Sequence, residues 1–321
     1  MTDGAGTDRA RSERDPADPR RLWAIVGATG TGKSDLSLRL AEALQRRGRA
    51  AEIVNADAMQ LYRAMDIGTA KLSADEQRGI PHHLFDALEV HEDAAVAWYQ
   101  GAARAVIADI FARGSDAILV GGSGLYVSGV VFDFRFPPRD DSLRAQLEAE
   151  LDREGPSVLY ARLQRIDPTT AARVDARNGR RVVRALEVLA QGGPTHGAAL
   201  PDAPELWHRP TTIVGVRLER AALVERLNRR VEQMWSMGLL DEVRGLRQHG
   251  LEDGTTARRA IGYAQAIAQL NGELSQEEAI AQTQALTRRY ARRQVSWFAR
   301  YPDIIWTDPS VSADRLADSV A

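Results

Sequence analysis

Apolar residues along this chain follow two periods, which alternate from residue 22 to about residue 120. Short continuous apolar runs at 22–26, 53–54 and 118–120 are typical of buried strands. Between them, apolar residues recur every three or four positions at 36–44 and 96–110, which predicts amphipathic helices. Strands that alternate with helices predict an α/β fold, in which helices cover both faces of a parallel sheet.

The pattern changes at Pro137. From there to about Trp207 only helical periods are present, which indicates a helical insertion. Strand character returns at 213–216, and residues 304–306 are expected to form a last short strand of the same sheet. We therefore expect a disordered tail at 1–20, a core domain made of 21–136 and 208–310, a helical insertion domain at 137–207 and a flexible tail at 311–321.

Composition narrows the classes of protein. Hydrophobic residues make up 44% of the 321 residues, and the net charge is −2, so any surface for nucleic acid must be a local patch. The chain has no cysteine, which excludes disulfides, thiolate zinc sites and a cysteine nucleophile. No segment resembles a secretory signal or a membrane span, so we expect a cytoplasmic protein with no membrane partner. We also expect the protein to act as a monomer.

The first predicted strand runs into a loop that matches the phosphate-binding pattern GxxxxGK[ST], and a predicted helix follows. Successive backbone N–H groups and the positive end of the helix cradle phosphate, the lysine adds a point charge, and the last hydroxyl can hold Mg²⁺. The lysine is one of only two in the chain, with Lys71. The loop predicts a polyphosphate site at Gly27, Ala28, Thr29, Gly30, Thr31, Gly32, Lys33 and Ser34, with Ser34 as the Mg²⁺ ligand.

A kinase or NTPase usually places a Mg²⁺-binding Asp after a later apolar strand. Here the strand at 118–120 runs into Gly121-Gly122-Ser123-Gly124, and the acid is Asp57, after the second strand. The carboxyl ends of neighbouring parallel strands share one crevice, so we expect Asp57 and Ser123 to face the phosphate loop. Asp is also a common helix N-cap, and the residues alone leave that alternative open for Asp57.

Seven blocks of the chain carry a common pattern. They are, in order, Gly27 to Ser34, Asp57 to Tyr62, Met65 to Lys71, Pro81 to Leu84, Gly121 to Tyr126, Arg180 to Glu187 and Ala260 to Tyr263. Together they resemble the tRNA dimethylallyltransferase family of bacterial type. Ala28 departs from a proline common in relatives and Ser123 from a threonine, but the loop still donates through its backbone and a hydroxyl is retained.

The resemblance implies an activity and its partners. It implies transfer of a dimethylallyl group from dimethylallyl pyrophosphate to N6 of adenosine 37, beside the anticodon, in tRNAs that read codons beginning with U. It also implies Mg²⁺ as cofactor and a core like that of the P-loop NTPases.

The residues can be assigned to this chemistry. An adenine amine is a poor nucleophile, so a carboxylate must accept its proton, and Asp57 fits that role. Lys33 and the loop stabilise the departing pyrophosphate, and Ser123 could bond to its oxygens. Arg144 and Arg220 are candidate guanidinium partners, for which a solvated charge on a helix face is the open alternative.

RNA recognition predicts basic and aromatic residues on exposed faces. Arg288, Arg289, Arg292 and Arg293 recur at helical spacing beside Tyr290 and Trp297, although an amphipathic core helix with a solvated arginine face would give the same pattern. Two further basic clusters surround 177–184 and 258–259. The expected tRNA-binding residues are Asp57, Ala58, Met59, Gln60, Arg180, Arg181, Arg184, Arg258, Arg259, Gly262, Tyr263, Arg289, Arg292, Arg293 and Trp297.

Three other functions remain open from the residues. A small-molecule P-loop kinase would share the sheet and loop but would not need a helical insertion and three arginine patches. An isopentenyltransferase acting on free adenine nucleotides could dispense with most C-terminal helices. A pure RNA-binding module would have no need of an intact phosphate loop.

Overall fold

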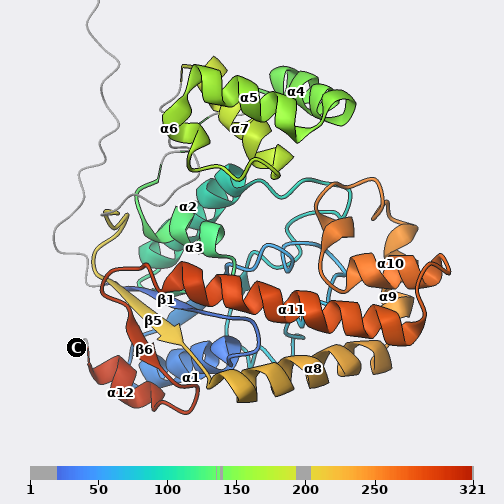
Figure 1. Ribbon diagram of the computed structural model, residues 1–321. Helices are drawn as coiled ribbons and strands as arrows, with labels where there is room; N and C mark the ends of the chain where they lie inside the picture. Colours follow the sequence, from blue (N-terminus) through green and yellow to red (C-terminus); the bar gives the residue numbers. More distant parts are fainter. Residues whose placement is uncertain (1–19, 135, 138–139, 193–203, 320–321) are drawn as a thin grey trace, which may run out of the picture. The chain divides into compact units, whose positions relative to one another are not determined.

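The computed structural model describes residues 20–134, 136–137, 140–192 and 204–319 (Figure 1). It divides into two compact units. We call Phe132–Glu205 the insertion unit, and the rest of the chain the core unit. The disordered tail expected at 1–20 lies outside the described residues, apart from Arg20.

The core unit contains a parallel sheet of six strands in the order β3-β2-β4-β1-β5-β6. The α/β fold class predicted from the hydrophobic pattern is confirmed. The expected strands are present within a residue or two of their predicted bounds, whereas the edge strand β3 was not predicted. The strands are β1 (Leu22–Gly27), β2 (Ala51–Asn55), β3 (His82–His83), β4 (Asp116–Gly121), β5 (Thr211–Val216) and β6 (Ile305–Thr307).

Alternate residues of each strand point to opposite faces of the sheet. On one face, Trp23 and Ile25 pack with helices α1 (Lys33–Arg46) and α12 (Ala313–Asp318). The other face carries α2 (Val96–Ala112), α3 (Gly124–Val131) and the long α11 (Gln276–Phe298), which crosses it in Figure 1. Because both faces are covered, β1 and β4 are buried throughout, which explains their continuous apolar sequence.

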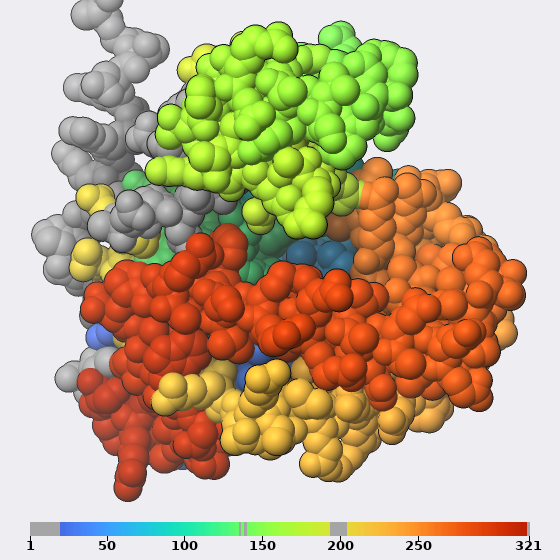
Figure 2. Space-filling model, viewed as in Figure 1, coloured from blue at the N-terminus to red at the C-terminus, as the bar shows by residue number. Residues whose placement is uncertain are grey.

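The C-terminal half of the core unit is helical. Helix α8 packs beside α11, and α9 and α10 pack against each other. Figure 2 shows α8 in yellow-orange and α11 in red-orange side by side on the surface. The bounds are α8 (Arg220–Ser236), α9 (Leu239–Arg247), a 3-10 turn η1 (Ala257–Arg259) and α10 (Tyr263–Leu270).

Helix α12 corrects the expectation of a flexible tail from residue 311. Leu316 and Ala317 are buried against α1, and Asp314 forms ion pairs with Arg46 and Arg47. A helix of only six residues leaves too short an apolar repeat to be distinguished from a tail by sequence pattern.

The insertion unit contains four helices among the described residues. Its apolar core joins Leu147, Leu159, Leu163 and Val182. The unit begins at Phe132 and ends at Glu205, where the sequence pattern suggested 137–207. The helices are α4 (Asp141–Glu154), α5 (Pro156–Ile166), α6 (Pro168–Ala171) and α7 (Gly179–Ala190). Within the described part of the chain, no helix is both long and apolar enough to cross a membrane.

Candidate active site

The phosphate loop joins β1 to α1 and depends on two glycine conformations. Gly27 has φ 145°, and a Cβ there would lie 2.3 Å from the Val216 carbonyl oxygen. Gly32 has φ 90° at the N-cap of α1, in the left-handed region that favours glycine. The positive end of α1 is thus presented at Lys33 and Ser34, as anion binding requires.

A cavity of about 750 Å³ opens beside this loop in the core unit. Thr29, Gly30, Gly32, Lys33 and Ser34 line it from the loop. The turn after β2 contributes residues that include Asp57 and Gln60. Helix α8 contributes Arg226, Arg229, Arg230, Gln233 and Met234, and Met237 follows its end. The carboxyl ends of the strands therefore meet at one crevice, as expected for a doubly wound sheet.

Asp57 lies in a turn that hydrogen bonds hold in place. Its own N–H donates to Asn55 Oδ1 at 2.9 Å, and Asp57 Oδ1 accepts the N–H of Met59 at 3.0 Å. The buried Asn55 also donates through Nδ2 to the carbonyls of Asp57 and Leu84. Asp57 thus caps a turn and lines the cavity at once. No helix begins at this residue, so the helix N-cap alternative is wrong, and a functional role for Asp57 stays a prediction.

Lys33, Asp57 and Arg230 are three of the charged residues that line the cavity. Lys33 Nζ donates to the Ala28 carbonyl at 2.7 Å. Burial lowers the pKa of Lys33 to about 8; the Asp57 carboxylate acts to raise it, and Arg230 to lower it. Burial also lowers the pKa of the Arg230 guanidinium, again opposed by Asp57. Lys33 and Arg230 line one cavity beside the phosphate loop, and burial disfavours their charged forms, so an added polyanion would be favoured there.

Ser123 lies in the turn after β4, where its hydroxyl accepts the N–H of Ala58 at 3.1 Å. The side chain is buried and does not line the cavity. Gly121 before it leaves no room for a Cβ, which would meet the Ala56 carbonyl oxygen at 2.2 Å. Ser123 therefore joins the β4 turn to the Asp57 turn, and it does not line the cavity beside the phosphate loop.

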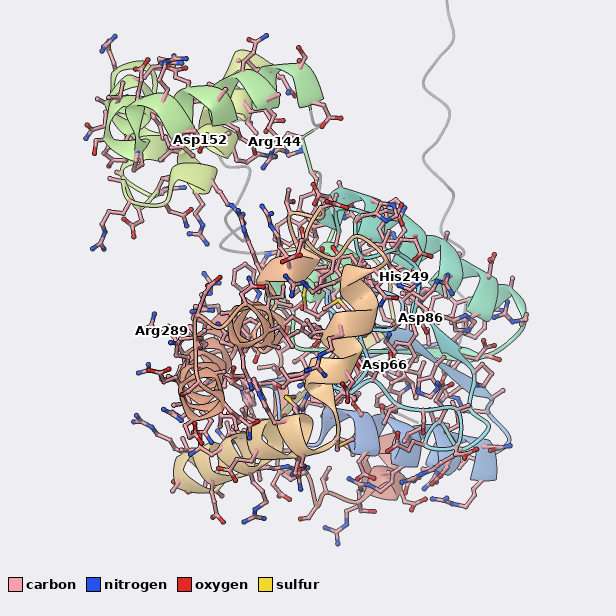
Figure 3. All side chains as sticks on the ribbon, turned by 90° about the vertical axis from the view of Figure 1, so that its right-hand side faces the viewer. Asp66, Asp86, Arg144, Asp152, His249 and Arg289 are labelled. Carbon is pink, nitrogen blue, oxygen red and sulfur yellow. The ribbon has the colours of Figure 1, made fainter. Side chains whose placement is uncertain are left out.

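The two arginines expected to supplement the loop do not line the cavity. Arg220 is exposed at the first position of α8, and Arg230, further along the same helix, lines the cavity instead. Arg144 belongs to the insertion unit (Figure 3), where its guanidinium pairs with Glu148 and with the buried Glu187. The sequence did not identify Arg230 as a cavity residue. Helix α8 contains four arginines, and which of them points inward depends on its position around the helix axis.

Helix α11 presents Arg289, Arg292 and Arg293 to solvent, and Arg289 projects from the helix in Figure 3. Arg288 instead donates to Asn228 Oδ1 of α8 at 2.6 Å. No carboxylate of the described residues pairs with the three exposed arginines. Their charges are therefore available to phosphate groups of a nucleic acid.

Trp297 differs from the expectation of an exposed stacking face. Its indole N–H donates to Ser128 Oγ at 3.1 Å, and its ring lies where a Cβ on Gly124 would be only 2.5 Å away. Arg300 lies over the ring with its guanidinium carbon 4.6 Å from the ring centre. Trp297 therefore packs α11 against α3, and the indole is largely occupied by protein contacts.

The basic cluster on α7 divides in the same way. Arg180 and Arg181 are exposed, whereas Arg184 pairs with Glu187 at 2.9 Å and donates to the Pro137 carbonyl. In the η1 region, Arg259 is exposed and Arg258 donates to the Glu252 carbonyl.

The expectation that Gly262 and Tyr263 contact tRNA is wrong, because both residues are buried. The Tyr263 hydroxyl donates to Glu242 Oε1 at 2.6 Å, and Glu242 Oε2 accepts the N–H of Ile67 at 2.7 Å. The Tyr263 ring lies against Gly68, where a Cβ would be 2.4 Å away. These residues therefore hold the loop at 66–70, part of which lines the cavity.

Lys71, the second lysine, is also structural. Its Nζ donates to the Tyr62 carbonyl and lies 2.7 Å from both Asp66 Oδ1 and Asp86 Oδ1. These bonds occupy all three N–H donors of the ammonium.

The donor set suits a Mg²⁺ ion that takes most of its ligands from a bound pyrophosphate and from water. Ser34 supplies a hydroxyl on the cavity wall, which is an oxygen ligand of the kind Mg²⁺ prefers. No group of three His, Cys, Asp or Glu residues that could hold a metal by itself occurs in the described ranges.

The chain is similar to known proteins of one family. The family model for IPP transferase matches residues 60–301. The chain is 59% identical over 297 residues to a tRNA dimethylallyltransferase of Clavibacter sepedonicus, covering 92% of this chain and 95% of that protein. A tRNA dimethylallyltransferase of Thermobifida fusca is 52% identical over 283 residues, covering 88% of each chain.

Solved structures give the same result. The tRNA isopentenylpyrophosphate transferase of Bacillus halodurans matches with a TM-score of 0.65 and 38% identity, covering 94% of each chain. A eukaryotic dimethylallyltransferase acting on tRNA matches with a TM-score of 0.74 and 27% identity, covering 90% of this chain and 74% of the other. The resemblance seen in the sequence blocks is confirmed, and the chain belongs to the IPP transferase family, a family of prenyl-transferring enzymes.

Proposed function

We propose that the protein transfers the dimethylallyl group of dimethylallyl pyrophosphate to N6 of adenosine 37 in tRNAs that read codons beginning with U. The products are N6-dimethylallyladenosine in tRNA and free pyrophosphate. The observation that carries the proposal is the shared cavity, in which the Asp57 carboxylate lies among the cations Lys33 and Arg230 beside the phosphate loop. We further propose that the enzyme works as a cytoplasmic monomer.

The acceptor half of the reaction is assigned to Asp57. The adenine amine has its lone pair delocalised into the ring, so it becomes nucleophilic only as it loses a proton. One oxygen of Asp57 is engaged by the Met59 N–H, and the carboxylate can accept the N6 proton as the new N–C bond forms. A positioned base of this kind contributes about 10²- to 10⁴-fold to the rate.

The donor half is assigned to the phosphate loop. As the bond between the allylic carbon and oxygen breaks, positive charge develops on the carbon and negative charge on the departing pyrophosphate. The N–H groups at the start of α1, with Lys33 and Arg230, can stabilise that anion. Bound Mg²⁺ would neutralise further charge on the pyrophosphate, with Ser34 as its protein ligand.

The acceptor RNA is assigned to the exposed arginines. Arg289, Arg292 and Arg293 on α11, with Arg180 and Arg181 on the insertion unit, offer charges for the backbone of the anticodon stem-loop. These exposed arginines do not support a small-molecule kinase, because a small phosphate acceptor would not need to contact them.

The test is incubation of the purified protein with dimethylallyl pyrophosphate labelled in the allyl group and with bulk tRNA. We expect label in tRNA, recovered after digestion as N6-dimethylallyladenosine, and no label on AMP offered in place of tRNA. Equal or better labelling of AMP would favour an enzyme of free nucleotides. Phosphoryl transfer from γ-labelled ATP, without prenyl transfer, would favour a kinase.

A further inference from the structure

Gln294 of α11 is a buried amide that connects the two halves of the site. Only 3% of its surface is exposed. Its Oε1 accepts the N–H of Thr29 in the phosphate loop at 2.8 Å. Its Nε2 donates to the carbonyl of Gly122, in the turn after β4, at 2.8 Å.

The two partners fix the orientation of the amide. Thr29 offers only a donor and Gly122 only an acceptor, so the oxygen and nitrogen of Gln294 cannot exchange places. A carboxylate at this position would accept from Thr29 but could not donate to Gly122. An aliphatic side chain would leave both backbone groups without a partner in a buried place.

The turn after β4 leaves no free space around the Gln294 amide. A Cβ on Gly122 would lie 2.3 Å from Gln294 Nε2, and a Cβ on Gly124 would lie 2.5 Å from the ring of Trp297. Gln294 and Trp297 are three residues apart, so they occupy one face of α11. That face of α11 therefore packs directly against Gly122 and Gly124, the two glycines that flank Ser123.

The contacts extend from the turn after β4 to the turn that contains Asp57, the proposed base. Ser123 accepts the N–H of Ala58, the residue after Asp57. Thr29 lines the cavity on the donor side, and Asp57 lines it on the acceptor side. One amide thus joins the phosphate loop to the turn that supports Asp57.

We propose that Gln294 is a positioning residue that sets the distance between the bound pyrophosphate and the Asp57 base. This inference rests on the proposed function, because it presumes that the reacting carbon and nitrogen are held by those two parts. The reaction requires the reacting atoms about 3–3.5 Å apart, and a misplacement of about 1 Å can cost on the order of 10²-fold in rate.

The experiment replaces Gln294 by Leu and by Glu. The measured quantities are the single-turnover rate at saturating substrates, the affinity for tRNA, and the thermal unfolding midpoint. For Gln294→Leu we expect a rate lower by about 10²-fold, with tRNA affinity within about twofold of wild type. The matched control is Gln284→Leu on the same helix, because Gln284 donates to Asn228 and Glu232 and touches neither turn. That control should keep its single-turnover rate.

The Glu variant adds a readout that loss of stability would not move. A protonated carboxyl group has one acceptor oxygen and one O–H donor, the same pair that the amide offers. The rate of Gln294→Glu relative to wild type should therefore recover as the pH falls and the new carboxyl group becomes protonated. Groups that titrate in both enzymes cancel in this ratio.

The outcomes separate the two proposals. If wild type transfers the label to tRNA and Gln294→Leu keeps a rate within about threefold, the positioning role is wrong and the proposed function stands. Weaker tRNA binding with an unchanged saturated rate would make Gln294 an RNA contact instead. If wild type itself does not modify tRNA, the proposed function fails before the Gln294 question arises.

Discussion

Asp57 and Lys33 line one cavity from two different strand ends, and the carboxylate of Asp57 opposes the burial that lowers the pKa of the Lys33 ammonium. Asp57 therefore supports the charged state of Lys33 while no substrate is present. A bound pyrophosphate would take over that role for Lys33. The carboxylate would then be left to act on the acceptor amine.

The first prediction concerns Asp57. The change Asp57→Asn keeps an oxygen that can accept the Met59 N–H, so the turn should persist. Because the amide is not basic, turnover should fall by about 10²- to 10⁴-fold while both substrates still bind. Single-turnover assays with separate binding measurements check this result. Turnover within about threefold of wild type would leave Asp57 with the capping role alone.

A second prediction follows from the pKa of Lys33, which lies near 8. As the pH rises from about 7 to about 9, the ammonium loses its proton, so affinity for dimethylallyl pyrophosphate should decline. Lys33→Ala should bind the donor about 10- to 100-fold more weakly at neutral pH, since it lacks a charged hydrogen bond. It should also lose the decline above pH 8, which titration calorimetry would show. A decline that persists in Lys33→Ala would assign the titration to another group.

The third prediction compares two arginines of α8. Arg230 lines the cavity and Arg220 does not. Arg230→Gln should therefore weaken donor binding by about 10- to 100-fold. Arg220→Gln, at the exposed start of the same helix, should change it little. The reverse order of effects in a competition assay would restore the assignment made from sequence.

The fourth prediction concerns the exposed face of α11. The double change Arg289→Gln with Arg293→Gln should weaken tRNA binding and reduce the slope of log affinity against log salt by about 1.4 to 1.8. Donor binding should persist, because neither side chain lines the cavity. Filter binding across a salt series measures the slope. An unaltered slope in a folded double mutant would remove α11 from the RNA surface.

The fifth prediction concerns Tyr263, whose hydroxyl donates to Glu242 within the core unit. Tyr263→Phe should lower the free energy of unfolding by about 1.5–3 kcal/mol, the usual worth of a hydrogen bond to a charged group. Affinity for tRNA should stay within about twofold. Denaturant unfolding and filter binding measure the two effects, and a large loss of tRNA affinity with unchanged stability would reinstate Tyr263 as an RNA contact.

The sequence predicted those parts of the fold and site that depend on neighbouring residues. The phosphate loop needs only eight consecutive positions, and buried parallel strands such as β1 and β4 are continuous apolar runs. Asp57 could be placed because strand ends in such sheets meet at one edge. By contrast, β3 has only two residues and no pattern of its own.

Residues that act through distant partners gave no signal. Gln294 is an uncharged amide next to a pair of arginines, and its role appears only when Thr29 and Gly122, far away in the chain, are brought to it. Trp297 is expected to contact RNA because aromatic residues near arginines suit stacking, and Tyr263 because it lies in a block of the family resemblance beside Arg258 and Arg259. In the folded chain, Glu242 and Ser128 already bond to these side chains.

The strand order has a further consequence for the donor. Strand β4 lies between β1, which carries the phosphate loop, and β2, which carries Asp57. Neighbouring strands are about 4.8 Å apart, so the two strand ends are separated by roughly 10 Å across the sheet. That spacing leaves room for a pyrophosphate and its first allylic carbon between anion site and base. If β1 and β2 were adjacent, the proposed base would lie about 4.8 Å from the phosphate loop. The intervening strand β4 sets a wider separation, which fits the proposed prenyl donor.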